Sequence, residues 1–261
     1  MRYLRLLALF AKTEFALAVE YRANLLLDLF EELIIVVSSL IAVLVLFSHT
    51  EVINGWTLGQ MIVLLGVYYV IQGAQSVVFE TSFERFMEHV RLGTLDFILI
   101  KPADSQFMVS ARHVQIAQLG QIALGLVLVG VGVARAGAPV GPLELAAFVL
   151  TLACGLSLVY CLLLVLSTLA FWATRIENLL AIFWSFLDAG RFPVDVYPGW
   201  LRITLSTVVP IGLAVTVPAQ AIAGRLDGPA FLVMLIGTAC VWLFAGWFWR
   251  FGLRRYTGAS A

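Results

Sequence analysis

The sequence predicts an all-α membrane protein with six transmembrane helices. Hydrophobic residues make up 62% of the 261 positions and charged residues only 12%, and the mean hydropathy is +1.00. Soluble domains contain about 45–50% apolar and about 25% charged residues. The length leaves room for six spans of about 20 residues with short loops. Because no polar run is long enough for a soluble domain, residues 1–261 are expected to form a single transmembrane domain.

Residues 1–23 have the pattern of a helix that lies in the membrane interface. Charged and polar side chains gather on one side of a helical wheel: Arg2, Arg5, Lys12, Thr13 and Glu20. Apolar side chains gather on the other side: Leu6, Leu7, Phe10, Leu17 and Tyr21. Helices with one charged and one apolar face bind at the boundary between lipid and water. The sequence therefore predicts an N-terminal interfacial helix.

The first predicted span is Leu33–Phe47, extended backwards through three carboxylates. Asp28, Glu31 and Glu32 lie three to four residues apart, so a helix places them on one face. Carboxylates near a membrane are costly unless they are hydrated or paired. They are interpreted as a solvated interfacial face, with a cation site or a substrate entrance as the alternative.

The second predicted span, Leu58–Phe79, carries a glycine at every seventh position. Gly59, Gly66 and Gly73 are close to two helical turns apart and therefore share a face. Small residues on one face allow the backbone of a neighbouring helix to come close. We expect another span to pack there.

The longest polar interval in the sequence is Thr81–His113. Thr81 and Glu84 have the spacing of a capping box, and Gly93 is a helix stop, so a short helix over Ser82–Leu92 is predicted. A charged helix between two apolar spans suggests contact with a soluble partner.

The later spans are predicted from four further apolar runs. They are Gln115–Ala134, Leu143–Trp172, Glu177–Ala189 and Pro229–Trp249. Between the last two, residues 193–228 contain Pro193, Pro198, Pro210 and Pro218. Proline removes a helix hydrogen bond and clashes with the preceding turn, so this region is predicted to form short, broken or re-entrant helices.

The distribution of Lys and Arg predicts the orientation. Six spans leave only Arg135, Arg191, Arg202 and Arg225 outside, so 12 of the 16 Lys and Arg residues (16 minus 4) lie inside. Positively charged residues near span ends favour the cytoplasmic side. Both termini and residues 81–113 are therefore expected in the cytoplasm, and residues 193–228 on the external side.

The sequence lacks the motifs of an ATPase, a hydrolase or a metal site. It contains no GxxxxGK[ST] phosphate loop, no HExxH and no GxSxG. Cys154, Cys161 and Cys240 lie within apolar runs without metal-ligand spacing. The net charge of zero gives no reason to expect a nucleic-acid partner. We expect a chain that is not itself an enzyme and binds no cofactor.

Three stretches resemble one branch of a known family. Residues 91–112 read RLGTLDFILIKPADSQFMVSAR, residues 192–210 read FPVDVYPGWLRITLSTVVP, and residues 252–261 read GLRRYTGASA. They are similar, in this order, to segments of bacterial ABC type-2 (ABC-2) transporter permeases with six spans. The resemblance implies a permease domain of an ATP-driven exporter in the bacterial cell (inner) membrane.

The resemblance also implies a coupling helix and its partners. That helix corresponds to Phe83, Glu84, Arg85, Phe86, Met87, Glu88, His89 and Arg91, and the turn after it to Gly93 and Asp96. Charges at Glu84, Glu88 and Arg91 are expected at the rim of the contact and Phe86 and Met87 as apolar anchors. The expected partners are a dimer of ABC ATP-binding subunits, which binds ATP and Mg²⁺, and a second, different permease chain; a homodimer is the alternative.

A substrate path is expected from polar and aromatic residues of the spans. They are Ser38, Ser39, Gln72, Gln75, Trp184 and Asp188. Such a lining suits an amphipathic or cationic drug-like molecule or a lipid. The alternatives are hydrogen bonds between helices for Gln72 and Gln75, and pairing with Arg191 for Asp188.

Two other classes of function remain as alternatives. An ATP-independent secondary transporter or channel would often show internal repeats and charges at mid-membrane, and the sequence shows no repeat and places no charge there. A membrane enzyme or assembly factor would lack the ATP-binding partner.

Overall fold

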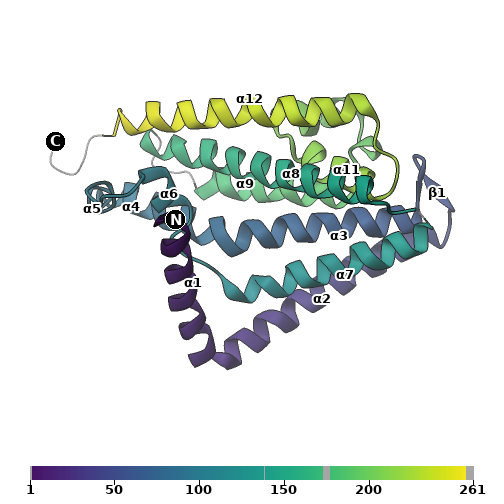
Figure 1. The fold of residues 1–261 in the computed structure, drawn as a ribbon, viewed down its shortest axis with the longest axis horizontal. Coiled ribbons are helices and arrows are strands. Elements are labelled where there is room, and N and C mark those ends of the chain that lie inside the picture. Colours follow the sequence, from purple (N-terminus) through teal and green to yellow (C-terminus); the bar gives the residue numbers. More distant parts are fainter. Residues whose placement is uncertain (1, 138, 173–176, 257–261) are drawn as a thin grey trace.

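A computed structural model describes residues 2–137, 139–172 and 177–256 and shows an almost entirely helical molecule (Figure 1). The predicted all-α class is confirmed. The strands of the described residues, β1 (Val52–Ile53) and β2 (Trp56–Thr57), form one small antiparallel hairpin, in which Ile53 pairs with Trp56. The chain therefore buries its backbone hydrogen bonds within helices, as a membrane requires.

Within the described residues, five helices are long and apolar enough to cross a membrane. They run over Arg22–Phe47, Leu58–Arg91, Ile116–Ala136, Pro142–Phe171 and Gly228–Leu253. Their elements are α2 (Arg22–Phe47), α3 (Leu58–Gln75), η1 (Ser76–Glu80), α4 (Thr81–Arg91), η2 (Ile116–Gln118), α7 (Leu119–Ala136), α8 (Pro142–Thr168), η3 (Leu169–Phe171) and α12 (Gly228–Leu253). A sixth span is counted if the bent pair Gly199–Val208 and Ile211–Ile222 is taken as one.

The two ends of the molecule differ in structure (Figure 1). One end, here called the hairpin end, carries β1 and β2. The other, the α4 end, carries α4, α5 (Asp96–Leu99) and α6 (Ser105–Ser110). Helix α1 (Arg2–Glu20) runs across the direction of the spans at the α4 end, which is the arrangement expected of an interfacial helix.

Helix α3 lies at the centre of the molecule and packs against α2, α7, α8 and α11. The predicted glycine face is confirmed: a Cβ on Gly66 would lie 2.6 Å from the Gly125 carbonyl oxygen of α7. Gly59 and Gly73 of α3 face Ala136 and Ile122 of α7 in the same way. Close backbone approach along the whole pair therefore replaces side-chain packing.

The described residues after α8 reach the hairpin end through several short helices instead of one long span. Helix α9 (Glu177–Asp188) has 12 residues and is therefore about 18 Å long, shorter than the apolar core of about 30 Å. The chain continues through η4 (Ala189–Arg191) and η5 (Val194–Val196) to the hairpin end, where the Asn54 side chain donates to the Asp195 carbonyl at 2.9 Å. The predicted span from Glu177 is thus a broken one.

The re-entrant helices predicted around the prolines are present. α10 (Gly199–Ile203) with η6 (Thr204–Val208) meets α11 (Ile211–Ile222) at an angle of 89° next to Pro210. After α11, the Arg225 guanidinium donates to the Gly55 carbonyl at 2.7 Å, so the chain leaves at the hairpin end. Pro218 does not interrupt its helix, contrary to the expectation, because α11 is held by α8 and α3 on the buried side.

One sequence prediction about α4 is wrong in detail. The helix itself is present over Thr81–Arg91, but Thr81 and Glu84 form no capping box. The reason is that η1 continues α3 directly into α4, so the first N–H groups of α4 already have carbonyl partners. The Thr81 hydroxyl instead accepts a hydrogen bond from the Gln115 side chain.

Alanine at Gly66 should destabilise the fold, because its Cβ would meet the backbone of α7 at 2.6 and 2.7 Å. We expect a loss of about 1–3 kcal/mol, measured as a lower midpoint of thermal unfolding in detergent. The matched control is Gly130→Ala on α7, where no atom lies within 4 Å of the added Cβ. Equal midpoints for the two variants would contradict the proposed role of the close contact.

Candidate functional site

Helix α4 presents a charged face to solvent. Glu84, Arg85, Glu88 and Arg91 are exposed, and the Arg85 guanidinium lies 3.5 Å from the Glu88 carboxylate. Glu84, Glu88 and Arg91 recur every three to four positions, and Arg85 lies three before Glu88, which places the four on one side of the helix. This side, with the turn after it, is the surface that α4 offers to another protein.

The opposite face of α4 is buried within the chain. Phe83 and Phe86 are fully buried, and Met87 is partly buried. The Phe86 ring lies 5.6 Å from Phe171 and 5.4 Å from Trp249. Phe86 was expected to anchor a partner; instead, it anchors α4 to η3 and α12. A partner on the charged face does not reach this ring.

The buried contacts of α4 extend into an aromatic cluster formed by Phe86, Phe171, Trp249 and Tyr256. Phe171 lies 5.8 Å from Trp249 and 5.7 Å from Tyr256. Burial raises the pKa of the Tyr256 phenol, which packs just beyond the end of α12. The cluster therefore joins α4 to two spans and to the chain that follows the last span.

Gly93 ends α4, as predicted. It has a φ of +66°, and the Thr94 amide donates to the His89 carbonyl at 2.9 Å. Together with the bond from the Gly93 amide to the Val90 carbonyl, this is a Schellman motif. The His89 ring lies 2.8 Å from the Thr94 hydroxyl, and Asp96 begins α5. The turn is thus held by the residues on either side of it.

Three exposed apolar side chains close in sequence to the charged face were not among the predicted site residues. Leu92 is exposed, and Phe97 and Ile100 are 69% and 77% exposed, whereas Leu95 and Ile98 between them are buried. The alternation was visible in the sequence as LDFILI, but only the fold shows which residues point outward. Exposed apolar side chains at a polar end of the molecule indicate an interaction surface.

A polar group lies deep among the spans. The Tyr68 hydroxyl donates to the Asp188 carboxylate at 2.7 Å, and the Arg191 guanidinium donates to the same carboxylate oxygen at 3.1 Å. Tyr68 is ten residues into α3, which is about 15 Å from the hairpin end. The pairing with Arg191, which stood as the alternative to a substrate-path role for Asp188, is therefore present. The Asp188 side chain is 53% exposed on the surface of this chain.

Of the other expected substrate-path residues, one serine belongs to the network around Asp188, whereas the second serine and the tryptophan form no hydrogen bond with it. The Ser39 hydroxyl accepts from Tyr69 at 2.6 Å, and the Tyr69 ring lies 5.0 Å from the Tyr68 ring, so Ser39 and Asp188 belong to one network. Ser38 is exposed on α2, and Trp184 lies on α9 with its ring 4.9 Å from Phe183.

Gln72 and Gln75 link helices. The Gln121 side chain of α7 donates to the Gln72 side chain at 3.1 Å, and the Gln75 side chain donates to the Leu156 carbonyl of α8 at 3.1 Å. These are the hydrogen bonds between helices that stood as the alternative to a path role. Interhelical bonds of this kind hold membrane helices together.

Neither site contains a metal-binding arrangement. In the part of the chain that the structure describes, no three His, Cys, Asp or Glu side chains come together as ligands. Tyr68, Tyr69 and Arg191 are polar groups of the deep network that the sequence reading did not include among the path residues. The only signal for the tyrosines was a pair of phenols inside an otherwise apolar run.

A family model matches most of the chain. The model of a family described as ABC-2 family transporter protein matches residues 33–260. The matched region runs from α2 through α12 and contains both the α4 surface and the deep polar group. No curated protein matches the chain.

Phenylalanine at Tyr68 should weaken the deep network, because it leaves the Asp188 carboxylate without the bond at 2.7 Å. Loss of a hydrogen bond to a charged group costs about 1.5–3 kcal/mol, which a lower midpoint of thermal unfolding would show. Tyr21→Phe removes the same hydroxyl from an exposed ring and serves as the control. If both variants unfold at the wild-type temperature, the network contributes nothing to stability.

Proposed function

The chain belongs to the ABC-2 transporter family, and from this premise we propose that it is the membrane-spanning permease subunit of an ATP-driven exporter in the bacterial inner membrane. The observation that carries the proposal is that α4 has one charged, exposed face and one apolar, buried face. On α4, one face is charged and exposed, and the other is locked by Phe83 and Phe86 to the spans.

The proposed orientation places the α4 end in the cytoplasm. Both ends of the described chain lie at the α4 end (Figure 1). Basic residues at this end include Arg85, Arg91, Lys101, Arg112, Arg250, Arg254 and Arg255. Positively charged residues near span ends favour the cytoplasmic side, which supports this orientation.

The proposed partner at the α4 end is a dimer of ABC ATP-binding subunits, which supplies ATP and Mg²⁺. The sequence has no phosphate loop of its own. In the proposal, Glu84, Glu88 and Arg91 form the polar rim, and Phe97 and Ile100 take the anchoring role first expected of Phe86. Apolar anchors inside a polar rim are the usual anatomy of a protein–protein contact.

Movement of the partner reaches the spans through the aromatic cluster. Phe86 contacts Phe171 after α8 and Trp249 of α12, and the Phe83 ring lies 6.2 Å from Tyr160 of α8. Packed aromatic contacts transmit displacement because they have little free volume. A push on α4 therefore shifts α8 and α12 together, provided that the two states of the transporter differ at this contact.

The deep polar group supports a substrate path between two permease subunits. A half-exposed Asp188 carboxylate with its Arg191 partner is costly against lipid tails, and it is stable beside a hydrated cavity or another protein surface. The proposed substrate is an amphipathic, drug-like or lipid molecule that is exported through this cavity. The second subunit is proposed to be a different permease chain, with a second copy of this chain as the alternative.

One observation favours a second candidate, an ATP-independent secondary transporter or channel. Charged groups among the spans occur in ion-coupled transporters, and the Asp188 carboxylate accepts a hydrogen bond from Tyr68 of α3. Purification of the tagged chain from its native membranes separates the two. A stoichiometric ATP-binding subunit and ATP-dependent efflux support the exporter, whereas efflux that follows a proton gradient without any such subunit supports the rival.

Serine at both Phe97 and Ile100 should detach the ATP-binding subunit, because the contact then loses its apolar anchors. We expect at least about a tenfold loss of co-purified subunit, which corresponds to about 1.4 kcal/mol. The control Val52→Ser removes an exposed apolar side chain at the hairpin end and should leave binding unchanged. Undiminished co-purification of the double variant would rule out this surface as the docking site.

A further inference from the structure

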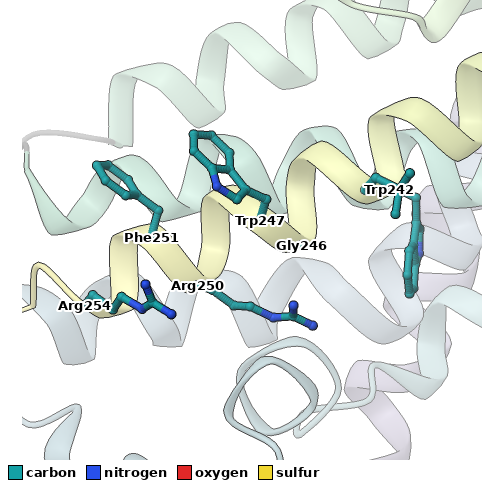
Figure 2. A pocket seen from close by; sticks show the side chains of 7 residues that line it. Trp242, Gly246, Trp247, Arg250, Phe251 and Arg254 are labelled. Carbon is teal, nitrogen blue, oxygen red and sulfur yellow. The ribbon is translucent and has the colours of Figure 1, made fainter.

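The exposed side of α12 carries a groove that the proposed transport function does not use. The groove has a volume of about 290 Å³ and lies at the α4 end of the helix. Its walls include Trp242, Gly246, Trp247, Arg250, Phe251 and Arg254 (Figure 2). The groove therefore combines an apolar wall with two cationic groups.

The apolar wall is a row of stacked rings. Trp247 and Phe251 lie 5.7 Å apart with an interplanar angle of 15°. Figure 2 shows both rings on one side of α12 and Gly246 between them and the deeper Trp242. No described atom of a neighbouring element lies within 4 Å of the position that a Gly246 Cβ would occupy, so the groove is uncovered at this point.

The cationic groups form a second row. Arg250 and Arg254 are one helical turn apart, and Figure 2 shows both guanidinium groups on the side of α12 away from the rings. Arg255 adds a third positive charge, 5.5 Å from the centre of the Phe251 ring. Within the described residues, no carboxylate forms an ion pair with Arg250 or Arg254.

The arginines and the deeper rings lie in the order in which a bilayer lipid places its charged headgroup and its acyl chains. Arg250 and Arg254 lie at the end of the span Gly228–Leu253, where phosphate groups of the bilayer are found. Trp242 lies eight residues earlier, about 12 Å deeper along the helix. Arg250 and Arg254 at the boundary, with Trp247 and Trp242 deeper along the helix, fit a molecule with an anionic head and an acyl chain.

We propose that this groove binds an anionic phospholipid, with its phosphate against Arg250 and Arg254 and an acyl chain along Trp247 toward Trp242. Two arginines with free donors bind a phosphate well because each guanidinium presents several N–H groups in one plane. The lipid is a resident ligand of the permease on its cytoplasmic side. The proposal concerns binding alone and does not depend on what the protein transports.

Charge complementarity favours a lipid over a second copy of the chain. A symmetric contact through this side of α12 would bring the arginines of one copy near those of the other. The sequence from Gly228 to Ala261 contains no Asp or Glu that would neutralise them. A phospholipid headgroup supplies the missing negative charge.

Native mass spectrometry of the purified protein, with any subunit that co-purifies, tests the proposal. The protein is equilibrated with equal amounts of phosphatidylglycerol and phosphatidylcholine before release from detergent. We expect wild-type protein to retain phosphatidylglycerol in preference to phosphatidylcholine. The double variant Arg250→Gln/Arg254→Gln should retain about tenfold less phosphatidylglycerol than wild type. The control Arg135→Gln/Arg202→Gln removes two exposed arginines elsewhere and should retain the lipid.

A second measurement locates the lipid. Brominated phosphatidylglycerol should quench wild-type tryptophan fluorescence more strongly than brominated phosphatidylcholine. The double variant Trp242→Phe/Trp247→Phe, which removes both tryptophans that line the groove, should abolish that difference while leaving the fold intact. Equal lipid retention by wild type and the Arg250/Arg254 variant overturns the proposal. So does disulfide trapping of two Gly246→Cys copies across this groove, which would make it a subunit interface.

Discussion

The contact between the backbones of α3 and α7 is the constraint on which the rest of the structure depends. Gly59, Gly66 and Gly73 bring the two helices so close that an added methyl group would meet α7 backbone or Ile122. Burial gives little drive for association within a lipid bilayer, so close dispersion contacts and interhelical hydrogen bonds must hold the spans. The bond between Gln72 and Gln121 adds to this contact.

Because α3 is held at the centre, the side chains on it and the helix that continues it are held in place as well. Its middle holds Tyr68 against Asp188, and its end continues through η1 into α4 without a break. Helix α4, proposed above as the docking helix, is thus the extension of the most buried candidate span of the described residues. A helix that continues a span carries displacement along its axis, whereas a helix on a flexible loop would absorb it.

The α4 end carries the two surfaces that are proposed above to bind other molecules. The exposed face of α4 and the apolar residues Phe97 and Ile100 form the proposed docking surface, and Arg250 and Arg254 form the proposed lipid site. Between them, the aromatic cluster closes the interior of the chain. The hairpin end has a different construction, in which Arg225 lies over the Trp56 ring at 4.8 Å and holds the chain after α11 to the hairpin.

The sequence by itself determined the class of protein, the helix positions and the glycine face, because hydropathy and a seven-residue spacing are local properties of the chain. It placed the α4 helix to within a residue or so and its stop at Gly93. The buried direction of Phe86, the outward direction of Phe97 and the pairing of Tyr68 with Asp188 were decided only by the tertiary structure. Each depends on which residue of a distant segment lies opposite, and no local pattern specifies that.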